Sequence, residues 1–132
     1  MNGVGIWFWS TTDNPLTSFS AFLYYCFTWS DQSVLYSAYN EASVNLWVWG
    51  DQENAWLVQQ GGLYPSWNDS TSGFEVHSGA QDGSGVVQTY FPAAAFRWYF
   101  GWVWISGAAG SWGSSQAQAF LNMRVEYLVF EQ

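Results

Sequence analysis

Apolar residues in this chain recur mostly at every second position, in short runs separated by clusters of Gly, Ser, Asn and Asp. A period of two places successive side chains on opposite faces of a β-strand. The pattern predicts strands at 4–10, 19–29, 33–39, 43–49, 55–60, 73–78, 86–91, 95–106 and 118–130. Strands joined by turns rather than crossover helices predict an all-β fold: an antiparallel β-sandwich, jelly-roll-like, of about eight or nine strands.

Two of these strands have one apolar face and one more polar face. In 19–29 the predicted core face carries Phe19, Ala21, Leu23, Tyr25, Phe27 and Trp29. In 118–130 it carries Leu121, Met123, Val125, Tyr127 and Val129. Arg124 and Glu126 fall on the opposite face of 118–130, where we expect them to pair weakly if exposed.

The segments WFW at 7–9, WVW at 47–49 and WVW at 102–104 are apolar on both faces. In the second of them Val48 shares a face with other aliphatic residues, while Trp47 and Trp49 share the opposite face. A sandwich of two sheets has one interior. The second face must therefore be covered by a loop, another subunit or a ligand, or stay exposed. The predicted interface or ligand-contact residues are Trp7, Trp9, Trp47, Trp49, Trp56, Trp67 and Trp112.

Composition narrows the function classes. The 132 residues predict one domain, 1–132, with 22 % aromatic and only 9 % charged residues, against about 25 % charged in typical domains. Lysine is absent, Arg97 and Arg124 are the only permanent cations, and the net charge is −8. Direct nucleic-acid binding and electrostatic attachment to a membrane are not expected, because both require basic patches. No apolar run approaches the roughly 20 residues of a membrane-spanning helix.

Candidate chemistry is sparse, and we expect no catalytic residue, cofactor or metal. His77 and Cys26 are the only residues of their types, too few for a zinc site built from Cys and His. We expect His77 on a polar strand face, and Cys26 buried and inert. Asp51 and Glu53 suggest a hydrolase carboxylate pair as a third hypothesis, although "GDQEN" reads first as a solvated turn.

Exposed aromatic rings fit two kinds of partner. Stacking on sugar rings, with amides and carboxylates bonding the hydroxyls, would suit Trp47, Trp49, Asn45, Trp56, Trp67, Asn68 and Asp69. The same rings would pack against another subunit, because interface cores are enriched in Trp and Tyr and depleted in Lys. The absence of lysine favours the subunit, since a freely diffusing module needs a charged surface.

The closing segment "LNMRVEYLVFEQ" resembles the last shell strand of jelly-roll coat or spike proteins of small viruses. The resemblance covers this segment alone and implies a jelly roll without catalytic residues. The opening "MNGVGIWFW" lacks the basic arm of genome-packaging coats, which implies a spike, decoration or minor shell protein.

We therefore expect a non-enzymatic structural subunit of a virion or extracellular assembly (capsid, decoration or spike type). Its expected partners are copies of itself or other assembly proteins. The alternative is a carbohydrate-binding lectin or module with glycan partners.

Overall fold

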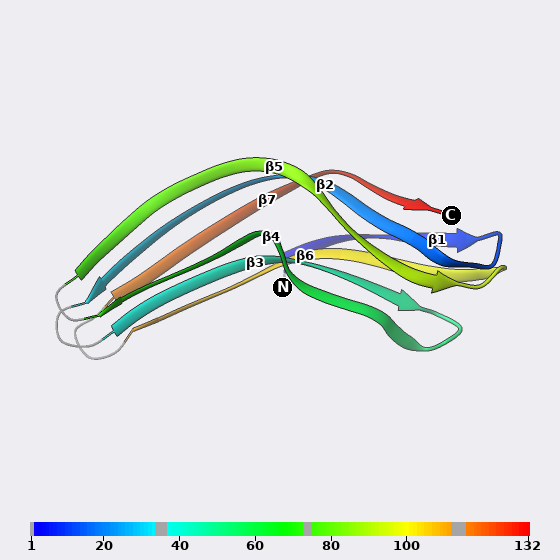
Figure 1. The fold of residues 1–132 in the computed structure, drawn as a ribbon, viewed down its shortest axis with the longest axis horizontal. Helices are drawn as coiled ribbons and strands as arrows, with labels where there is room; N and C mark the ends of the chain where they lie inside the picture. Colours follow the sequence, from blue (N-terminus) through cyan, green and yellow to red (C-terminus); the bar gives the residue numbers. More distant parts are fainter. Residues whose placement is uncertain (1, 34–36, 73–74, 112–115) are drawn as a thin grey trace.

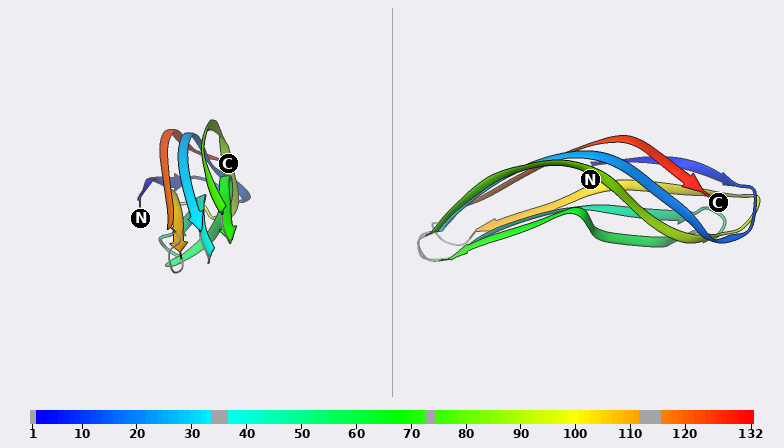
Figure 2. Two further views of the ribbon diagram at one scale, coloured as in Figure 1. Left: turned by 90° about the vertical axis from the view of Figure 1, so that its left-hand side faces the viewer. Right: turned by 45° about the horizontal axis from the view of Figure 1, so that its top comes forward.

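A computed structural model describes residues 2–33, 37–72, 75–111 and 116–132. The strands are β1 (Asn2–Ser10), β2 (Asn14–Ser33), β3 (Ser37–Gly50), β4 (Ala55–Ser72), β5 (Glu75–Ala93), β6 (Arg97–Ser111) and β7 (Gln116–Glu131). One sheet has the order β1-β6-β3-β4 and the other the order β5-β2-β7. The two antiparallel sheets form two long, curved layers, which confirms the predicted all-β sandwich (Figures 1 and 2).

The seven strands are longer than the predicted segments. For example, β5 is one continuous strand that spans two predicted segments: 86–91 and the described part, 75–78, of 73–78. The pairs β1 with β6, β2 with β5, and β3 with β4 are nested, while β7 lies on the other edge of β2. Nested antiparallel pairs are typical of jelly rolls, but those have eight strands. The jelly-roll topology therefore remains a prediction.

The core lies between the inner faces of the two sheets. Its buried apolar residues are Phe19, Ala21, Leu23, Tyr25, Phe27, Val44, Leu46, Val48, Val87, Phe91, Ala93, Tyr99 and Val103. The predicted core face of the strand at 19–29 is thus confirmed, with Trp29 partly buried at its end. The aliphatic face of the strand at 43–49 is also confirmed, because Val44, Leu46 and Val48 are fully buried.

The predicted core face of the last strand is wrong in its second half. The register of β7 against β2 shifts by one residue at Glu126, which is the extra residue of a β-bulge. The shift turns Tyr127 outward and brings Leu128 and Phe130 against the core. Val129 therefore shares the outward face with Tyr127, since alternation resumes after the bulge.

Glycines explain why β5 continues through "SGAQDGSG", which the sequence predicts to be a turn. Gly79 pairs with Trp29 across the sheet, and Gly83 pairs with Tyr25. An added Cβ at either glycine would overlap the ring of its partner. These glycines therefore provide room for large inward-facing rings, a recognised reason for glycine inside a strand.

The same packing makes a stability prediction at Gly101, where an added Cβ would overlap Phe19 and lie 2.6 Å from Phe130. Because Phe19 is fully buried and cannot move into solvent, Gly101→Ala should lower the free energy of unfolding by about 1–3 kcal/mol. Urea denaturation measures this. The double variant Gly101→Ala/Phe19→Leu should lose less than the sum of the single variants. Additive losses would contradict the proposed overlap.

Candidate functional site

The outer face of the four-stranded sheet carries a continuous layer of aromatic rings, which we call the aromatic wall. Its members alternate with core residues along β1, β3 and β6, and β4 adds one more indole. The members are Trp7, Trp9, Trp47, Trp49, Trp56, Trp98, Phe100, Trp102 and Trp104.

The rings of the wall contact one another directly. Trp47 lies near its centre, with its ring centroid 5.1 Å from that of Trp56, 5.1 Å from Trp104 and 6.0 Å from Trp102. These three contacts have interplanar angles of 71–90°. Edge-to-face pairs contribute about 0.5–1.5 kcal/mol each beyond their buried area. The wall is therefore an ordered layer held by its own contacts.

Glycines on the edge strand β1 allow rings of β6 to pack closely against its backbone. Gly5 pairs with Trp102, and Gly3 pairs with Trp104. An added Cβ at Gly3 would overlap the Trp102 indole, and one at Gly5 would overlap Phe100. The rings of β6 thus lean over the bare backbone of β1, as Trp29 leans over Gly79 inside the core.

The wall is only partly shielded within the single chain. Relative exposures are 55 % for Trp7, 47 % for Trp98, 42 % for Trp9 and 37 % for Trp56. The remaining members are partly buried against these neighbours. The second apolar face predicted from the tryptophan triplets therefore exists and meets solvent.

The structure brings together Trp7, Trp9, Trp47, Trp49 and Trp56 of the predicted contact residues. The side chain of Trp67 and the whole of Trp112 lie outside the part of the chain that is described. Four further members were not among the predicted contacts: Trp98, Phe100, Trp102 and Trp104. Their alternation in "RWYFGWVW" was the signal that would have identified them.

Asn45, a predicted sugar-binding residue, is buried, and its amide is engaged within the sheet. Its Nδ2 donates to Ser106 Oγ at 3.1 Å and to the Trp104 carbonyl at 3.4 Å. Ser43 Oγ lies 3.1 Å from Ser106 Oγ. These contacts stabilise the junction of β3 and β6 and leave the amide donor poorly placed for a sugar hydroxyl.

The outer face of the other sheet is more mixed. Phe22 stacks with Tyr127 at 5.6 Å, and Arg124 lies over the Tyr24 ring at 4.7 Å. Arg124 Nε is 3.8 Å from Glu126 Oε2, which confirms the predicted pair. Both side chains are exposed, so the pair contributes at most about 1 kcal/mol.

Cys26 also lies on that mixed face. The expectation that it is buried is wrong, because Phe22 to Trp29 alternate across β2 and Cys26 falls on the outer side. A hydrogen bond with Asp82, its cross-strand partner, raises the pKa of the thiol, with smaller contributions from desolvation and from the Asp82 charge. A raised pKa keeps the thiol protonated and weakly nucleophilic.

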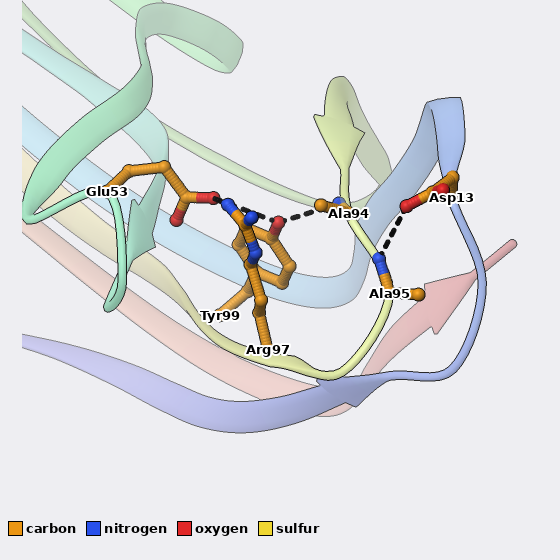
Figure 3. Close-up of polar contacts among 6 residues, drawn as sticks. All are labelled: Asp13, Glu53, Ala94, Ala95, Arg97 and Tyr99. Atoms are coloured by element: carbon orange, nitrogen blue, oxygen red, sulfur yellow. Dashed lines mark hydrogen bonds and ion pairs between the residues drawn. The ribbon is translucent and has the colours of Figure 1, made fainter.

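A polar cluster fixes the β3–β4 turn to the start of β6 (Figure 3). Arg97 Nη1 donates to Glu53 Oε1 at 2.9 Å, and the Tyr99 hydroxyl donates to the same oxygen at 3.3 Å. The Ala94 N–H in turn donates to the Tyr99 hydroxyl oxygen at 2.8 Å. Asp13 Oδ1 accepts from the Ala95 N–H at 2.8 Å, which ties the β1–β2 connection to the same corner.

The electrostatics of the cluster oppose a general-acid role for Glu53, and its ion pair with Arg97 gives it a structural one. Burial alone would raise the pKa of Glu53, but hydrogen bonds from its own backbone, Arg97 and Tyr99 outweigh that effect and lower it. Burial raises the pKa of Tyr99, against a lowering by the Ala94 N–H, and the nearby Glu53 carboxylate raises it further. A glycosidase general acid needs a raised pKa. Glu53 is therefore better understood as a structural anion.

Asp51 lies in the same turn and faces a different environment. Its N–H donates to the Trp98 carbonyl at 3.2 Å. Asp51, Trp7 and Trp98 line an open hollow of about 450 Å³ at the margin of the aromatic wall. The hollow therefore combines two half-exposed indoles with one carboxylate.

Other chemistry is limited in the described ranges. His77 is exposed on β5. Among the described residues, no group of three or more His, Cys, Asp or Glu side chains is arranged to hold a metal ion. None of these residues belongs to a helix with the length and hydropathy needed to cross a bilayer.

The chain matches no protein-family model, and it has no significant match among curated proteins or solved structures.

The lowered pKa of Glu53 predicts a pH dependence of stability. A carboxyl group whose pKa is lower in the folded than in the unfolded chain stabilises the fold above its unfolded-state pKa. That contribution is lost as the pH falls through the folded-state pKa. Glu53→Gln should therefore lower the free energy of unfolding by about 1 kcal/mol at pH 7 and by much less at about pH 3.

Urea denaturation at both pH values measures the difference. Glu126→Gln, on the exposed pair, serves as the control and should have little effect at either pH. An equal loss from Glu53→Gln at both pH values would contradict the assignment.

Proposed function

We propose that this protein is a non-enzymatic structural subunit of a virion or extracellular assembly, and that it associates with copies of itself through the aromatic wall. The observation that carries the proposal is a contiguous layer of rings on one sheet face, with four indoles 37–55 % exposed. An apolar patch of this size is at the upper end of what monomeric proteins expose, and such patches often mark interaction sites.

The area of the wall suits a second protein surface. A fully buried Trp removes about 150–250 Å² from water, so the four most exposed indoles present roughly 400 Å². The partly buried rings add on the order of 200 Å². Stable interfaces bury about 800 Å² per partner, and the wall with a modest rim reaches that range. A small ligand would leave most of the wall uncovered.

The uncharged side chains of the wall are compatible with a second copy as the occupant, although the rest of the surface is acidic. The chain carries a net charge of −8 and no lysine, so two copies repel each other over most of their surfaces. None of the nine side chains of the wall is ionisable near neutral pH. Two copies can therefore pack these nine side chains together, and no charge among them is buried unpaired.

Two observations support the assembly context. The nested strand pairing is compatible with the jelly-roll winding of viral shell proteins. The closing strand also carries the resemblance to coat and spike proteins. Subunits in such shells are covered by neighbours, which would explain how a chain with only 9 % charged residues tolerates an exposed aromatic face.

Light scattering coupled to size exclusion, across micromolar concentrations, tests self-association. We expect the wild-type chain to dimerise or assemble further. Trp7→Glu/Trp9→Glu should weaken association by at least about tenfold, because it places charges in a desolvated, self-facing interface.

The control variant is Val86→Glu/Tyr90→Glu. These residues are 56 % and 55 % exposed on β5, the edge strand of the other sheet. This control should leave association unchanged, and circular dichroism should show that both variants remain folded. A wild-type chain that is strictly monomeric, or equal weakening by both double variants, would overturn the proposal.

A further inference from the structure

The hollow lined by Trp7, Trp98 and Asp51 differs from the rest of the aromatic wall because it contains a charge. It lies where β1, β6 and the β3–β4 turn approach one another, at the end of the sandwich that carries the β1–β2 and β5–β6 connections (Figure 1). Its volume of about 450 Å³ falls within the usual range of small-molecule sites, roughly 300–1,000 Å³.

The two indoles form a corner. Their planes meet at 88°, and their centroids are 6.5 Å apart. Both are about half exposed, so part of each indole is accessible to a ligand. Neighbouring rings support this geometry, because Trp98 contacts Trp9 at 5.2 Å and Trp7 contacts Phe100 at 5.1 Å. The corner is therefore in place before any ligand arrives.

The position of Asp51 is fixed by the backbone. Its N–H donates to the Trp98 carbonyl at 3.2 Å, and its own carbonyl accepts from the Asn54 N–H at 3.2 Å. Neither bond uses the carboxylate. Two residues further along the turn, Glu53 binds Arg97 and holds the turn against β6. Asp51 therefore lines the hollow beside the two indoles, while the chain's two arginines pair with Glu53 and Glu126 instead.

The net charge of the molecule and the side chains that line the hollow together indicate which class of ligand it binds. The Arg97 guanidinium, the permanent cation next to Trp98 in the chain, is already neutralised by Glu53 at 2.9 Å. With a net charge of −8, the molecule attracts cations and repels anions. A neutral sugar needs several hydrogen-bond partners for its hydroxyls, and Asp51 is the one non-aromatic side chain that lines the hollow among the described residues. Aromatic faces beside a carboxylate suit a cation that carries methyl groups.

We propose that this hollow binds a small organic cation of the quaternary-ammonium class, free or as a methylated lysine side chain. The onium group sits in the Trp7–Trp98 corner, where both ring faces attract its charge, and the Asp51 carboxylate supplies the counter-charge. The hollow is formed within one copy, so the cation site does not require self-association. Because Trp7 and Trp98 also belong to the aromatic wall, a second copy on the wall would compete with the cation for these two indoles.

Titration of the full chain with choline chloride tests the site by calorimetry and by tryptophan fluorescence, at constant ionic strength and at a protein concentration low enough for light scattering to show a monomer. The matched probe is dimethylbutanol, the neutral carbon isostere of choline, and methyl glucoside probes the sugar alternative. We expect saturable binding of choline and at least about tenfold weaker binding of the isostere.

Three variants assign the binding to the hollow. Asp51→Asn keeps the shape of an exposed turn residue and should weaken choline binding about three- to tenfold, with no effect on the isostere. Trp98→Ala should abolish saturable binding. Trp56→Phe alters the wall outside the hollow and should leave the affinity unchanged. If Trp98→Ala does not fold, the Asp51→Asn result still decides the question.

Equal binding of choline and its isostere would show an apolar pocket, and preferred binding of methyl glucoside would show a sugar site. Unsaturable response to all probes would show no site at all. Each of these results overturns the proposal. A monomeric chain that binds choline would contradict the proposed self-association and leave the cation site standing.

Discussion

The alternation of side chains across β6 is the constraint on which this structure depends. Tyr99 and Val103 enter the core, so Trp98, Trp102 and their aromatic neighbours must face outward. The strand cannot bury both faces in a sandwich with one interior. Because β6 lies between β1 and β3, the rings of all three strands join in one layer. The aromatic wall is the direct consequence.

Aromatic rings packed over glycines are the second recurrent feature, and they occur both in the core and in the aromatic wall. Trp29 covers Gly79 on the inner face of one sheet, while Trp102 leans over Gly3 on the outer face of the other. In each case a missing side chain lets a large ring lie close to the backbone of the neighbouring strand. This packing suits the long, curved strands seen in Figure 2.

Periodicity predicted the all-β class, the core face of β2 and the two-faced tryptophan strands, because those depend on local alternation. The predictions from periodicity were wrong where a strand distant in the sequence determines the local structure. Glu126 is the extra residue of a β-bulge in the pairing of β7 with β2. Gly79 lies within a strand, and not in a turn as predicted, because the Trp29 ring packs against it. The sequence pattern also could not predict the hollow, because only the register of β3 against β6 brings Asp51 next to Trp98.

Hydroxyl-radical footprinting at low and high protein concentration tests most directly whether the aromatic wall is covered by a second copy. Trp7, Trp9 and Trp98 report on the wall, and Tyr90 and Tyr127, similarly exposed on the opposite face, are internal references. If a second copy covers the wall, oxidation of the three indoles falls as the concentration rises, while oxidation of the two tyrosines stays constant. Oxidation of the indoles that does not change with concentration would contradict it.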